Sequence, residues 1–246
     1  MPPTRAISQW RNMLNFWGDR SGVLAPFGRL AERGDRVPDM AEDIFSVVSV
    51  DVVAVAYDRG ARRVLFGSHA RTAPPFEGDP ALPGVVVLSG ERLVHAAGRA
   101  LAKLGLPEEP TAMGQLRTFD EPARDPRGPS LSISMWAAFP HASEAPGTTW
   151  APLDDPLPLC FDHDQIVAES RRILAGMLWR DLRFTRALTG PRFSAADAVA
   201  MTAQLTGREV HRANLNRDLA KTPGLVEAGL APATGGRPPK LWRWEE

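Results

Sequence analysis

HRANLNRDLAKTPGLVEAGLAPATGGRPPKLWRW, residues 211–244, is the stretch that decides the fold of the C-terminal part of this chain. It opens with a predicted helix, which we expect to run from about Val210 to Thr222. Leu215 and Leu219 lie four residues apart in this helix and therefore share one face. Arginine, asparagine and lysine side chains cover the remaining surface. The pattern predicts a buried seam opposite a basic, amide-rich surface.

After this helix the pattern changes to that of a β-hairpin. Leu225-Val226 is expected as one strand, and the alternating Leu241-Trp242-Arg243-Trp244 as the return strand. Between them, residues 235–240 (GGRPPK) form an extended, slim tip. The helix and hairpin together are typical of a recognition helix followed by a wing.

A second helix is expected directly upstream. Ser194 and Asp197 are spaced as in a capping box, which predicts a helix running to Leu205 and ending at Thr206-Gly207. Two helices joined by a tight turn match a helix-turn-helix, because a helix fits the major groove and Arg, Asn and Lys bond base edges and phosphates. The alternative is an ordinary solvated amphipathic helix. The order helix, helix, hairpin favours a winged helix that binds double-stranded DNA.

The expected DNA contacts follow from the faces of the second helix. Arg217 lies roughly opposite the Leu215 and Leu219 seam and between two alanines, so we expect it to reach bases. The helix positions to either side of Arg217 should contact phosphates, and Arg237 at the tip should enter the adjoining minor groove. The flanking helix positions are Arg212, Asn214, Asn216 and Lys221, and the tip also carries Lys240.

Charge is unevenly divided along the chain. The whole sequence has 29 basic and 29 acidic residues, so its formal net charge is zero. Residues 160–246 hold 13 Lys and Arg against 10 Asp and Glu, a net +3, which leaves 16 against 19, a net −3, for residues 1–159. This modest asymmetry places the affinity for phosphate in the C-terminal part.

Length and cysteine content narrow the class of protein further. The 246 residues suffice for two small domains. A single cysteine, Cys160, excludes an internal disulfide framework and fits a reducing cytoplasm. The sequence has no cationic leader with an apolar core and no apolar run near the roughly 20 residues that a membrane helix needs. We therefore expect a cytoplasmic protein with no membrane partner.

Prolines mark the boundary between the two parts. Their density between residues 139 and 159 disfavours a helix or a central strand and predicts an extended linker. Asp162 is then expected to cap a helix that runs to about Leu188, with Gln165 returning the bond. The apolar stripe of this helix should pack on its own domain or on a second copy. A metal site at Asp162-His163-Asp164 is the alternative, but consecutive positions do not share a helix face.

The part before the linker has an α/β pattern. A strand is expected at 47–57 and its partner at 63–66, joined by the turn Asp58-Arg59-Gly60. The further elements expected are a strand at 82–88, a helix that starts near Gly90 and ends at Gly105, and a strand at 130–138.

Motifs in this part resemble a Nudix box. They are Leu82-Pro83-Gly84, Gly90-Glu91, Ala96-Ala97, Arg99 and Gly105-Leu106, and the segment RDPRG at 124–128 is similar to one common in Nudix proteins that handle ADP-ribose. Phe161-Asp162-His163, Arg212-Ala213-Asn214-Leu215 and Gly236-Arg237-Pro238 extend the likeness, which covers about Val47 to the C-terminus.

The whole pattern resembles the Nudix-related transcriptional regulators of NAD metabolism, the NrtR family. The resemblance implies an α+β protein, in which a Nudix-like α/β/α sandwich with a mixed sheet precedes a winged helix-turn-helix domain. It also implies a homodimer that binds operator DNA and a sensor domain that binds ADP-ribose or a related nucleotide.

The Nudix-like box departs from the pattern that hydrolysis needs. A working box places several glutamates on one helix, because several carboxylates hold Mg²⁺ against a pyrophosphate. Glu91 and Arg99 keep their spacing, but Ala100 stands where the next acid is expected, and Lys103 and Leu104 replace the acidic pair. We therefore predict no metal, no cofactor and no hydrolysis, with Glu91 and Arg99 in structural roles.

The effector pocket is predicted from cations and aromatics that the resemblance places near it. Arginines would bind a pyrophosphate, and an aromatic ring would contact an adenine or ribose. The alternative is that these arginines are solvated loop residues and that one of the rings is core. The candidates are Arg71, Phe76, Arg117, Phe119 and Arg127, with His69 beside them.

The first 45 residues lie outside the resemblance. Ile7, Trp10, Leu14 and Trp17 recur at helical spacing and predict an amphipathic helix that docks on the sensor domain or on a second copy. The expected divisions are an N-terminal extension (1–45), a Nudix-like sensor (46–140), a Pro-rich linker (141–160) and a winged helix-turn-helix domain (161–246).

Two functions from different classes follow. The preferred interpretation is a DNA-binding transcriptional regulator, a repressor, whose N-terminal part responds to a nucleotide effector. The alternative is a Nudix-type nucleoside diphosphate hydrolase with a C-terminal interaction module.

Overall fold

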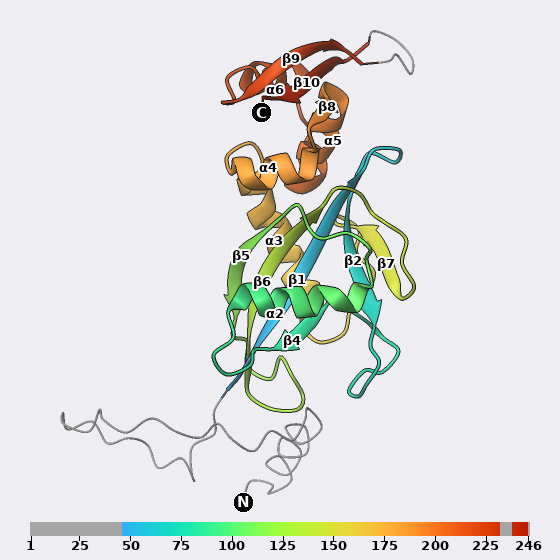
Figure 1. Ribbon diagram of the computed structural model, residues 1–246, viewed down its shortest axis with the longest axis vertical. Coiled ribbons are helices and arrows are strands. Elements are labelled where there is room, and N and C mark those ends of the chain that lie inside the picture. Colours follow the sequence, from blue (N-terminus) through green and yellow to red (C-terminus); the bar gives the residue numbers. More distant parts are fainter. Residues whose placement is uncertain (1–45, 232–237, 246) are drawn as a thin grey trace, which may run out of the picture.

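The computed structural model describes residues 46–231 and 238–245 of the chain. The predicted helix around Trp10 and Trp17, and Arg237 at the wing tip, lie outside these residues. A large sheet with helices forms one end of the described part, and a small sheet with further helices forms the other (Figure 1). Element labels follow Figure 1.

The larger sheet is mixed and has seven strands within the described residues. Its two central strands, β1 (Val47–Asp58) and β6 (Ser130–Phe139), run parallel, and the other pairs are antiparallel. The order is β3-β2-β1-β6-β5, with β4 paired to one end of β1 and β7 paired to β2. The remaining strands are β2 (Arg63–Ala70), β3 (Pro80–Ala81), β4 (Gly84–Val86), β5 (Ala112–Phe119) and β7 (Thr148–Pro152).

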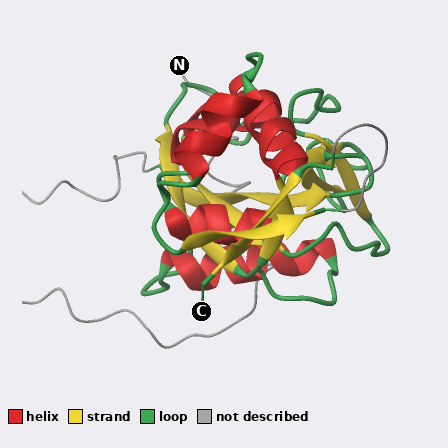
Figure 2. Cartoon of the chain, turned by 90° about the horizontal axis from the view of Figure 1, so that it is seen from above, coloured by secondary structure: helices red, strands yellow, loops and turns green. Residues whose placement is uncertain are grey.

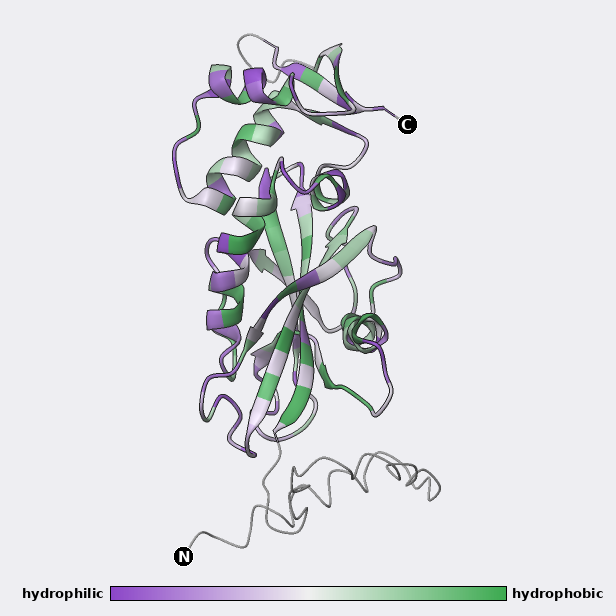
Figure 3. Ribbon diagram, turned by 90° about the vertical axis from the view of Figure 1, so that its left-hand side faces the viewer, coloured by the Kyte–Doolittle hydropathy of each residue, from purple (hydrophilic) through white to green (hydrophobic). Residues whose placement is uncertain are grey.

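Helices cover both faces of this sheet, which explains why β1 is apolar on both sides. Even-numbered residues of β1 from Val50 to Ala56 pack in a cluster with α2 (Leu93–Leu101). Odd-numbered residues from Val53 to Tyr57 pack in a second cluster with α3 (His163–Met177) and α4 (Leu182–Thr189). The views from above and from the side show the sheet between these helices (Figures 2 and 3). The expected α/β/α sandwich is confirmed.

The helix of the Nudix-like box ends where the sequence predicts. α2 continues as one 3₁₀ turn, η1 (Ala102–Leu104), and stops at Gly105, whose φ is 62°. A residue in this left-handed conformation is the usual helix C-cap, and glycine adopts it without a steric penalty.

The predicted linker contains a strand that was not predicted from the sequence, because the segment is rich in proline. Residues 148–152 form β7 on the outer side of β2, with Leu65 opposite Pro152. The sequence disfavoured a helix or a central strand here, and β7, an edge strand, does not contradict that prediction. β7 pairs on one side alone, and an edge strand tolerates proline because its outer side needs no ladder donor.

The long helix predicted to run to Leu188 is in fact two helices. α3 ends at Met177, and Trp179 follows with a φ of 68°. Asp181 then caps α4, since its Oδ1 accepts hydrogen bonds from the backbone nitrogens of Arg183 (3.0 Å) and Phe184 (3.1 Å). The apolar spacing continued through the break because both helices pack on the same core, so the pattern did not reveal it.

The C-terminal part is a winged helix. α5 (Ala195–Thr206) and α6 (Arg212–Leu219) form the helix-turn-helix, and the small sheet has the order β8-β10-β9. The Ser194–Asp197 capping box is present, and Gly207 ends α5 in the left-handed conformation, as predicted. The strands are β8 (Arg192–Ser194), which was not predicted, β9 (Leu225–Leu230) and β10 (Lys240–Trp244).

α6 is shorter than the sequence predicted. His211 is extended and precedes the helix, and the chain tightens after Leu219. The backbone nitrogens of Lys221 and Thr222 bond carbonyls three residues back, at 3.0 Å each, just before Pro223. The residue before a proline avoids the helical conformation, so the helix cannot continue to Thr222. The apolar periodicity alone had predicted that it would.

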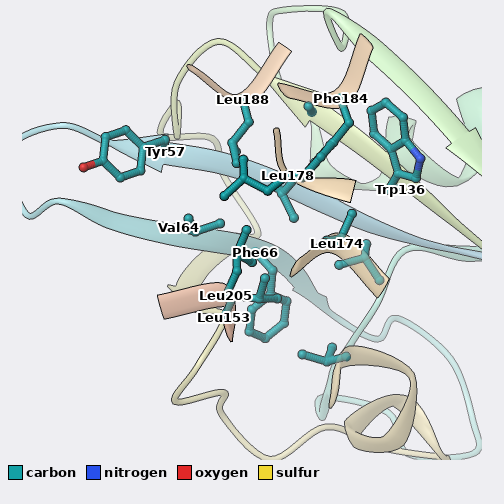
Figure 4. Close-up of a cluster of buried hydrophobic side chains, with 14 of the residues drawn as sticks. Tyr57, Val64, Phe66, Trp136, Leu153, Leu174, Leu178, Phe184, Leu188 and Leu205 are labelled. Atoms are coloured by element: carbon teal, nitrogen blue, oxygen red, sulfur yellow. The ribbon is translucent and has the colours of Figure 1, made fainter. Parts of the chain in front are cut away.

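The two parts share a hydrophobic core. Sheet residues such as Phe66 and Trp136 pack with Leu174, Phe184 and Leu205 from α3, α4 and α5 (Figure 4). The opposite end of α5 packs in the core of the winged helix through Ala195 and Ala198. α5 is therefore a common element of the sheet core and the helix-turn-helix. No helix among the described residues is long and apolar enough to cross a membrane.

Candidate functional site

The α6 helix presents the surface that the sequence predicts for a recognition helix. Leu215 and Leu219 are buried in a cluster with Trp242. The predicted contact residues Arg212, Asn214, Arg217 and Lys221 are exposed. Arg217 Nη2 donates a 2.8 Å hydrogen bond to Asn214 Oδ1, so these two side chains act as a pair on the exposed face.

Two other predicted contact residues are engaged with the protein itself. Asn216 is half-buried, and its Oδ1 is buried without a hydrogen-bond partner in the described part of the chain. Lys240 Nζ lies 2.5 Å from Glu227 Oε2 on the neighbouring strand and 5.9 Å from the centre of the Trp242 ring. Glu227 offsets the charge of Lys240, so Lys240 is a weaker candidate for phosphate contact than Arg212 or Lys221.

Buried polar contacts fix the helix-turn-helix to the hairpin between β1 and β2. Tyr57 Oη donates to Asp197 Oδ1 at 3.1 Å, and burial raises the pKa of Tyr57, which keeps it the donor. Gln204 on α5 bonds both backbone groups of Val64: its Oε1 accepts from the nitrogen at 2.6 Å, and its Nε2 donates to the oxygen at 2.9 Å. The amide thus extends the edge of β2 as a strand partner would.

In the Nudix-like box, Glu91 and Arg99 form an ion pair that joins the loop ahead of α2 to the helix itself. Arg99 Nε and Nη2 donate to the two oxygens of Glu91, each at 2.7 Å, and Arg99 Nη2 also donates to Val86 O at 2.8 Å. Glu91 Oε2 further accepts from Leu88 N at 2.9 Å. The Arg99 hydrogen bonds lower the pKa of Glu91 to about 2. Both side chains therefore form hydrogen bonds that fix the loop ahead of α2.

The other positions of the box do not provide ligands for Mg²⁺. Ala100 and Leu104 are buried in the core cluster under α2. Lys103 directs its ammonium to the sheet edge, where Nζ donates to the carbonyl of Gly84. Mg²⁺ binds oxygen ligands, above all carboxylates, and an ammonium repels it. Among the described residues, no group of three or more His, Cys, Asp or Glu side chains is arranged to hold a metal ion.

A buried ionic network lies where β1, β4 and α3 meet. Arg124 donates to both oxygens of Asp162, at 2.9 and 2.8 Å, and to Asp51 Oδ2 at 3.3 Å. Ser132 Oγ donates to the same Asp51 oxygen at 2.5 Å. Asp162 is the N-cap residue of α3, as predicted, but the predicted capping hydrogen bond of its side chain was wrong, because the carboxylate binds Arg124 instead. A Cβ on Gly84 would lie 1.9 Å from Asp51 Oδ1, so the network requires glycine there.

His163 is buried beside this network and is neutral. Its Nδ1 accepts a hydrogen bond from Leu82 N at 3.0 Å, and burial lowers its pKa. Its Nε2 lies 3.6 Å from Asp51 Oδ1. His163 therefore locks the Leu82-Pro83-Gly84 segment against α3.

Three of the predicted effector residues come together around Phe161. The ring of Phe76 meets that of Phe161 edge to face, with centres 4.8 Å apart. The guanidinium carbons of Arg71 and Arg127 lie 4.7 and 5.7 Å from the centre of the Phe161 ring. Phe161, in the left-handed conformation with a φ of 59°, is the centre of this group, although its sequence pattern predicted no ligand-binding role. Nothing local in the sequence signals this, because its neighbours come from distant loops.

Two predicted effector residues lie elsewhere. Phe119 is buried in the core beneath α3. Arg117 lies 5.1 Å above the Phe119 ring and pairs with Glu169 of α3 at 3.5 Å. His69 is buried near Arg71, and burial lowers its pKa, while its Nδ1 lies 2.9 Å from Ala70 O. Phe119 is therefore a core residue, which was the alternative to its predicted role in ligand binding.

A depression of about 800 Å³ adjoins the Phe161 group. Phe76, Phe161, Arg124 and Asp162 line it, together with Cys160 and the prolines of the neighbouring loops. Burial raises the pKa of Cys160 to about 11, so its thiol stays protonated and is a poor nucleophile. The carboxylates of Asp79 and Glu121 also line the depression, whereas Arg71 and Arg127 are not among its lining residues.

Solved structures with a similar fold span both parts of the chain. NrtR from Shewanella oneidensis in complex with a 27mer DNA has a TM-score of 0.64 and 24% identity, over 80% of this chain and 93% of that one. A second crystal structure of the same NrtR gives 0.64 and 24%, over 81% and 94%. The chain has the fold of NrtR. Because the likeness to NrtR covers more than the sheet, it includes the C-terminal module.

A MutT/nudix family protein from Enterococcus faecalis is also similar, with a TM-score of 0.62 and 20% identity over 82% of this chain and 89% of that one. No protein-family model and no curated protein sequence matches the chain. The NrtR likeness therefore rests on the arrangement of the elements, a Nudix-like sandwich followed by a winged helix.

Proposed function

We propose that this chain is a sequence-specific DNA-binding transcriptional regulator, whose Nudix-like domain binds a nucleotide effector without hydrolysing it. The observation that carries the proposal is the exposed basic face of α6, backed by a buried seam and joined to α5 through a tight turn. Arg212, Arg217 and Lys221 lie on or directly after this helix and are exposed. The similarity in fold to an NrtR crystallised with DNA supports the same assignment.

The regulator acts as a homodimer on a two-fold-related operator. One winged helix has a small specific surface, and two symmetric half-sites double it. Repression is the simplest outcome, since a dimer bound over a promoter blocks polymerase. Light scattering of the free protein and of its DNA complex tests the assembly, and a monomer in both states would contradict it.

The effector is a nucleotide of the ADP-ribose type. Arg71 and Arg127 supply cations for a diphosphate, and Phe76 and Phe161 supply rings for a base or ribose. β1 and β2 reach from this region to the hairpin that contacts α5, which gives ligand binding a route to the helix-turn-helix.

In vitro selection of bound duplexes from a random DNA library tests the central part of the proposal. We expect an enriched sequence with two-fold symmetry, and a change in its affinity when ADP-ribose is added. Recovery of no common sequence from the library would contradict the assignment of α6 as a recognition helix.

The second candidate function, a Nudix-type hydrolase, is favoured by the intact Glu91–Arg99 loop. We expect no hydrolysis of ADP-ribose with Mg²⁺ or Mn²⁺, because Ala100 and Lys103 cannot hold a divalent cation. Turnover that exceeds background and disappears in Glu91→Gln would establish the hydrolase instead.

A further inference from the structure

A second hollow, of about 730 Å³, lies where the winged helix meets the end of the larger sheet. Three arginines line it: Arg59 from the turn between β1 and β2, Arg186 from α4, and Arg192 from β8. Trp244, the last residue of β10, also lines it. The remaining lining residues are Thr111, Pro140, Ala187, Gly190 and Pro191. None of the described residues that line this hollow is acidic.

A series of direct contacts brings two of these arginines to the same wall. Arg59 Nη2 donates a 2.5 Å hydrogen bond to Thr189 O. Thr189 Oγ1 accepts a hydrogen bond from Trp244 Nε1 at 2.9 Å. The guanidinium carbon of Arg186 lies 4.9 Å from the centre of the Trp244 ring. Arg59 and Arg186 are therefore attached to two residues that contact each other.

The charge of Arg59 is only partly offset by nearby acids. Asp197 Oδ2 lies 3.8 Å from Arg59 Nη1, but this carboxylate also accepts hydrogen bonds from the cap of its own helix and from Tyr57. Asp58, next to Arg59, accepts hydrogen bonds from the backbone of its own turn. Because a guanidinium has five N–H donors, Arg59 can bind an anion in the hollow as well.

Arg186 and Arg192 are compensated even less. Among the described residues, neither forms an ion pair, and Glu245, the exposed acid that follows Trp244, pairs with neither of them. Arg243 of β10 also lies directly opposite Arg192. Like charges opposite one another in a sheet are destabilising, and an anion beside them offsets the repulsion. This end of the small sheet is therefore a surface that attracts anions.

We propose that this hollow is a binding site for a small anion that carries a phosphate group. Guanidiniums suit this ligand because they donate pairs of parallel hydrogen bonds to phosphate oxygens. The hollow shares no lining residue with the depression beside Phe161, so the site is separate from the proposed effector group. A bound anion would join Arg59 of the larger sheet to Arg186 and Arg192 of the winged helix.

The position of the hollow favours a small anion over the DNA backbone. Trp244 pairs with Leu225 at one end of the β9–β10 hairpin, and Lys240 pairs with Leu230 at the other end, next to the wing tip. The tip is the part of the hairpin that the proposed function brings to DNA. The hollow lies at the opposite end of these strands.

Phosphorus-31 nuclear magnetic resonance tests the site, with inorganic phosphate and glycerol phosphate as probes at constant ionic strength. The phosphorus line of each probe should broaden in the presence of the full chain, and the effect should saturate. Arg186→Met and Arg192→Met should each weaken binding by at least about tenfold, the loss expected for a charge-assisted contact. Tighter binding of the glycerol ester would identify an ester as the ligand, and tighter binding of the inorganic ion would identify free phosphate.

Arg183→Met is the matched control, because Arg183 is an exposed arginine of the same helix that does not line the hollow. Arg71→Met removes a cation of the Phe161 group instead. Both controls should bind the probes as the wild type does, and thermal unfolding confirms that each variant is folded.

Three results would overturn the inference. The first is no saturable broadening of either probe by the wild type. The second is an unchanged affinity of Arg186→Met and Arg192→Met, or an equal loss in Arg183→Met. The third is binding that is lost in Arg71→Met and kept in Arg186→Met, which would place the phosphate at the Phe161 group. Weaker DNA binding by Arg186→Met and Arg192→Met without any phosphate binding would assign these arginines to the DNA backbone and also overturn it. The DNA selection experiment is independent of the phosphate titrations, so their failure does not decide the DNA-binding assignment.

Discussion

At the residue scale, the division of labour on α6 is open to a direct test. Arg217 lies on the exposed face opposite the buried leucines, whereas Lys221 lies beyond the helix end. We expect Arg217→Ala to cost roughly 1 to 3 kcal/mol on the selected operator and to flatten its preference over scrambled DNA. Lys221→Ala should weaken both DNAs about equally and lower the salt slope by about one unit per half-site contact.

Fluorescence anisotropy across a salt series measures both effects. Arg172→Ala is the control, because Arg172 is an exposed arginine of α3 that pairs with Glu169. If neither Arg217→Ala nor Lys221→Ala changes operator affinity, α6 is not the recognition helix.

The Glu91–Arg99 pair predicts a pH-dependent contribution to stability. Its hydrogen bonds depress the folded-state pKa of Glu91 to about 2, below the roughly 4.3 of an unfolded chain. The contribution is therefore complete above the unfolded value and is lost as the pH falls towards 2. Denaturant unfolding of the wild type and Glu91→Gln should differ most above pH 5 and converge near pH 2. A difference that is independent of pH would show that the pair does not act through this charge.

Residue roles that depend on local spacing were predictable, and those that depend on distant partners were not. The Ser194–Asp197 capping box is a contact within one turn and was readable from the sequence. Asp162 also had the spacing of a cap, but Arg124, 38 residues away, binds its carboxylate instead. No ligand-binding role of Phe161 was predictable, because Arg71 and Phe76 come from the loop after β2 and Arg127 comes from the loop between β5 and β6.

At the element scale, Gln204 supplies side-chain hydrogen bonds that join α5 to β2, beside the packing of Leu205 against the sheet core. Gln204 is buried, and its Oε1 accepts the hydrogen bond from Val64 N. Gln204→Ala leaves that buried N–H without a partner, which should destabilise the fold by about 1 to 3 kcal/mol. Urea unfolding measures the loss. Gln165→Ala, the same deletion at an exposed position of α3, should stay within about 0.5 kcal/mol of the wild type, and equal effects of the two would refute the role of Gln204.

The elements with strong periodicity were predictable, and those formed by pairing to distant strands were not. β1, β6 and α5 were found from alternation or capping. β7 and β8 are short edge strands. β7 contains a proline and pairs with β2, and β8 follows a proline and pairs with β10. The break between α3 and α4 left no signal because the apolar spacing continued on both sides of it.

At the scale of the whole molecule, we expect the Nudix-like sandwich and the helix-turn-helix to unfold as one cooperative unit. Leu205 of α5 packs in the sheet core together with Leu174 and Phe184, and Ala198 of the same helix packs in the core of the winged helix (Figure 4). We expect a single urea transition in which tryptophan fluorescence and far-UV circular dichroism coincide. Two separated transitions would show that the winged helix folds by itself and would weaken the route from effector to DNA.

Arg71 of the Phe161 group follows the end of β2, whereas Tyr57 and Val64, which bond α5, lie at the other end of β1 and β2. If the proposed function holds, we expect a ligand at the Phe161 group to act on α5 through these two strands. This geometry was not predictable from the sequence, which implied two domains separated by a linker.

Genome-wide footprinting of the bound sites, with the wild type and Arg217→Ala compared in the source organism, tests the DNA-binding assignment most directly. We expect the wild type to protect a small set of promoter sites with two-fold-symmetric sequence, and Arg217→Ala to lose these sites while retaining weak, unspecific binding. Footprints absent from the wild type, or identical in the two proteins, would contradict the assignment of this chain as a DNA-binding regulator that reads its operator through α6.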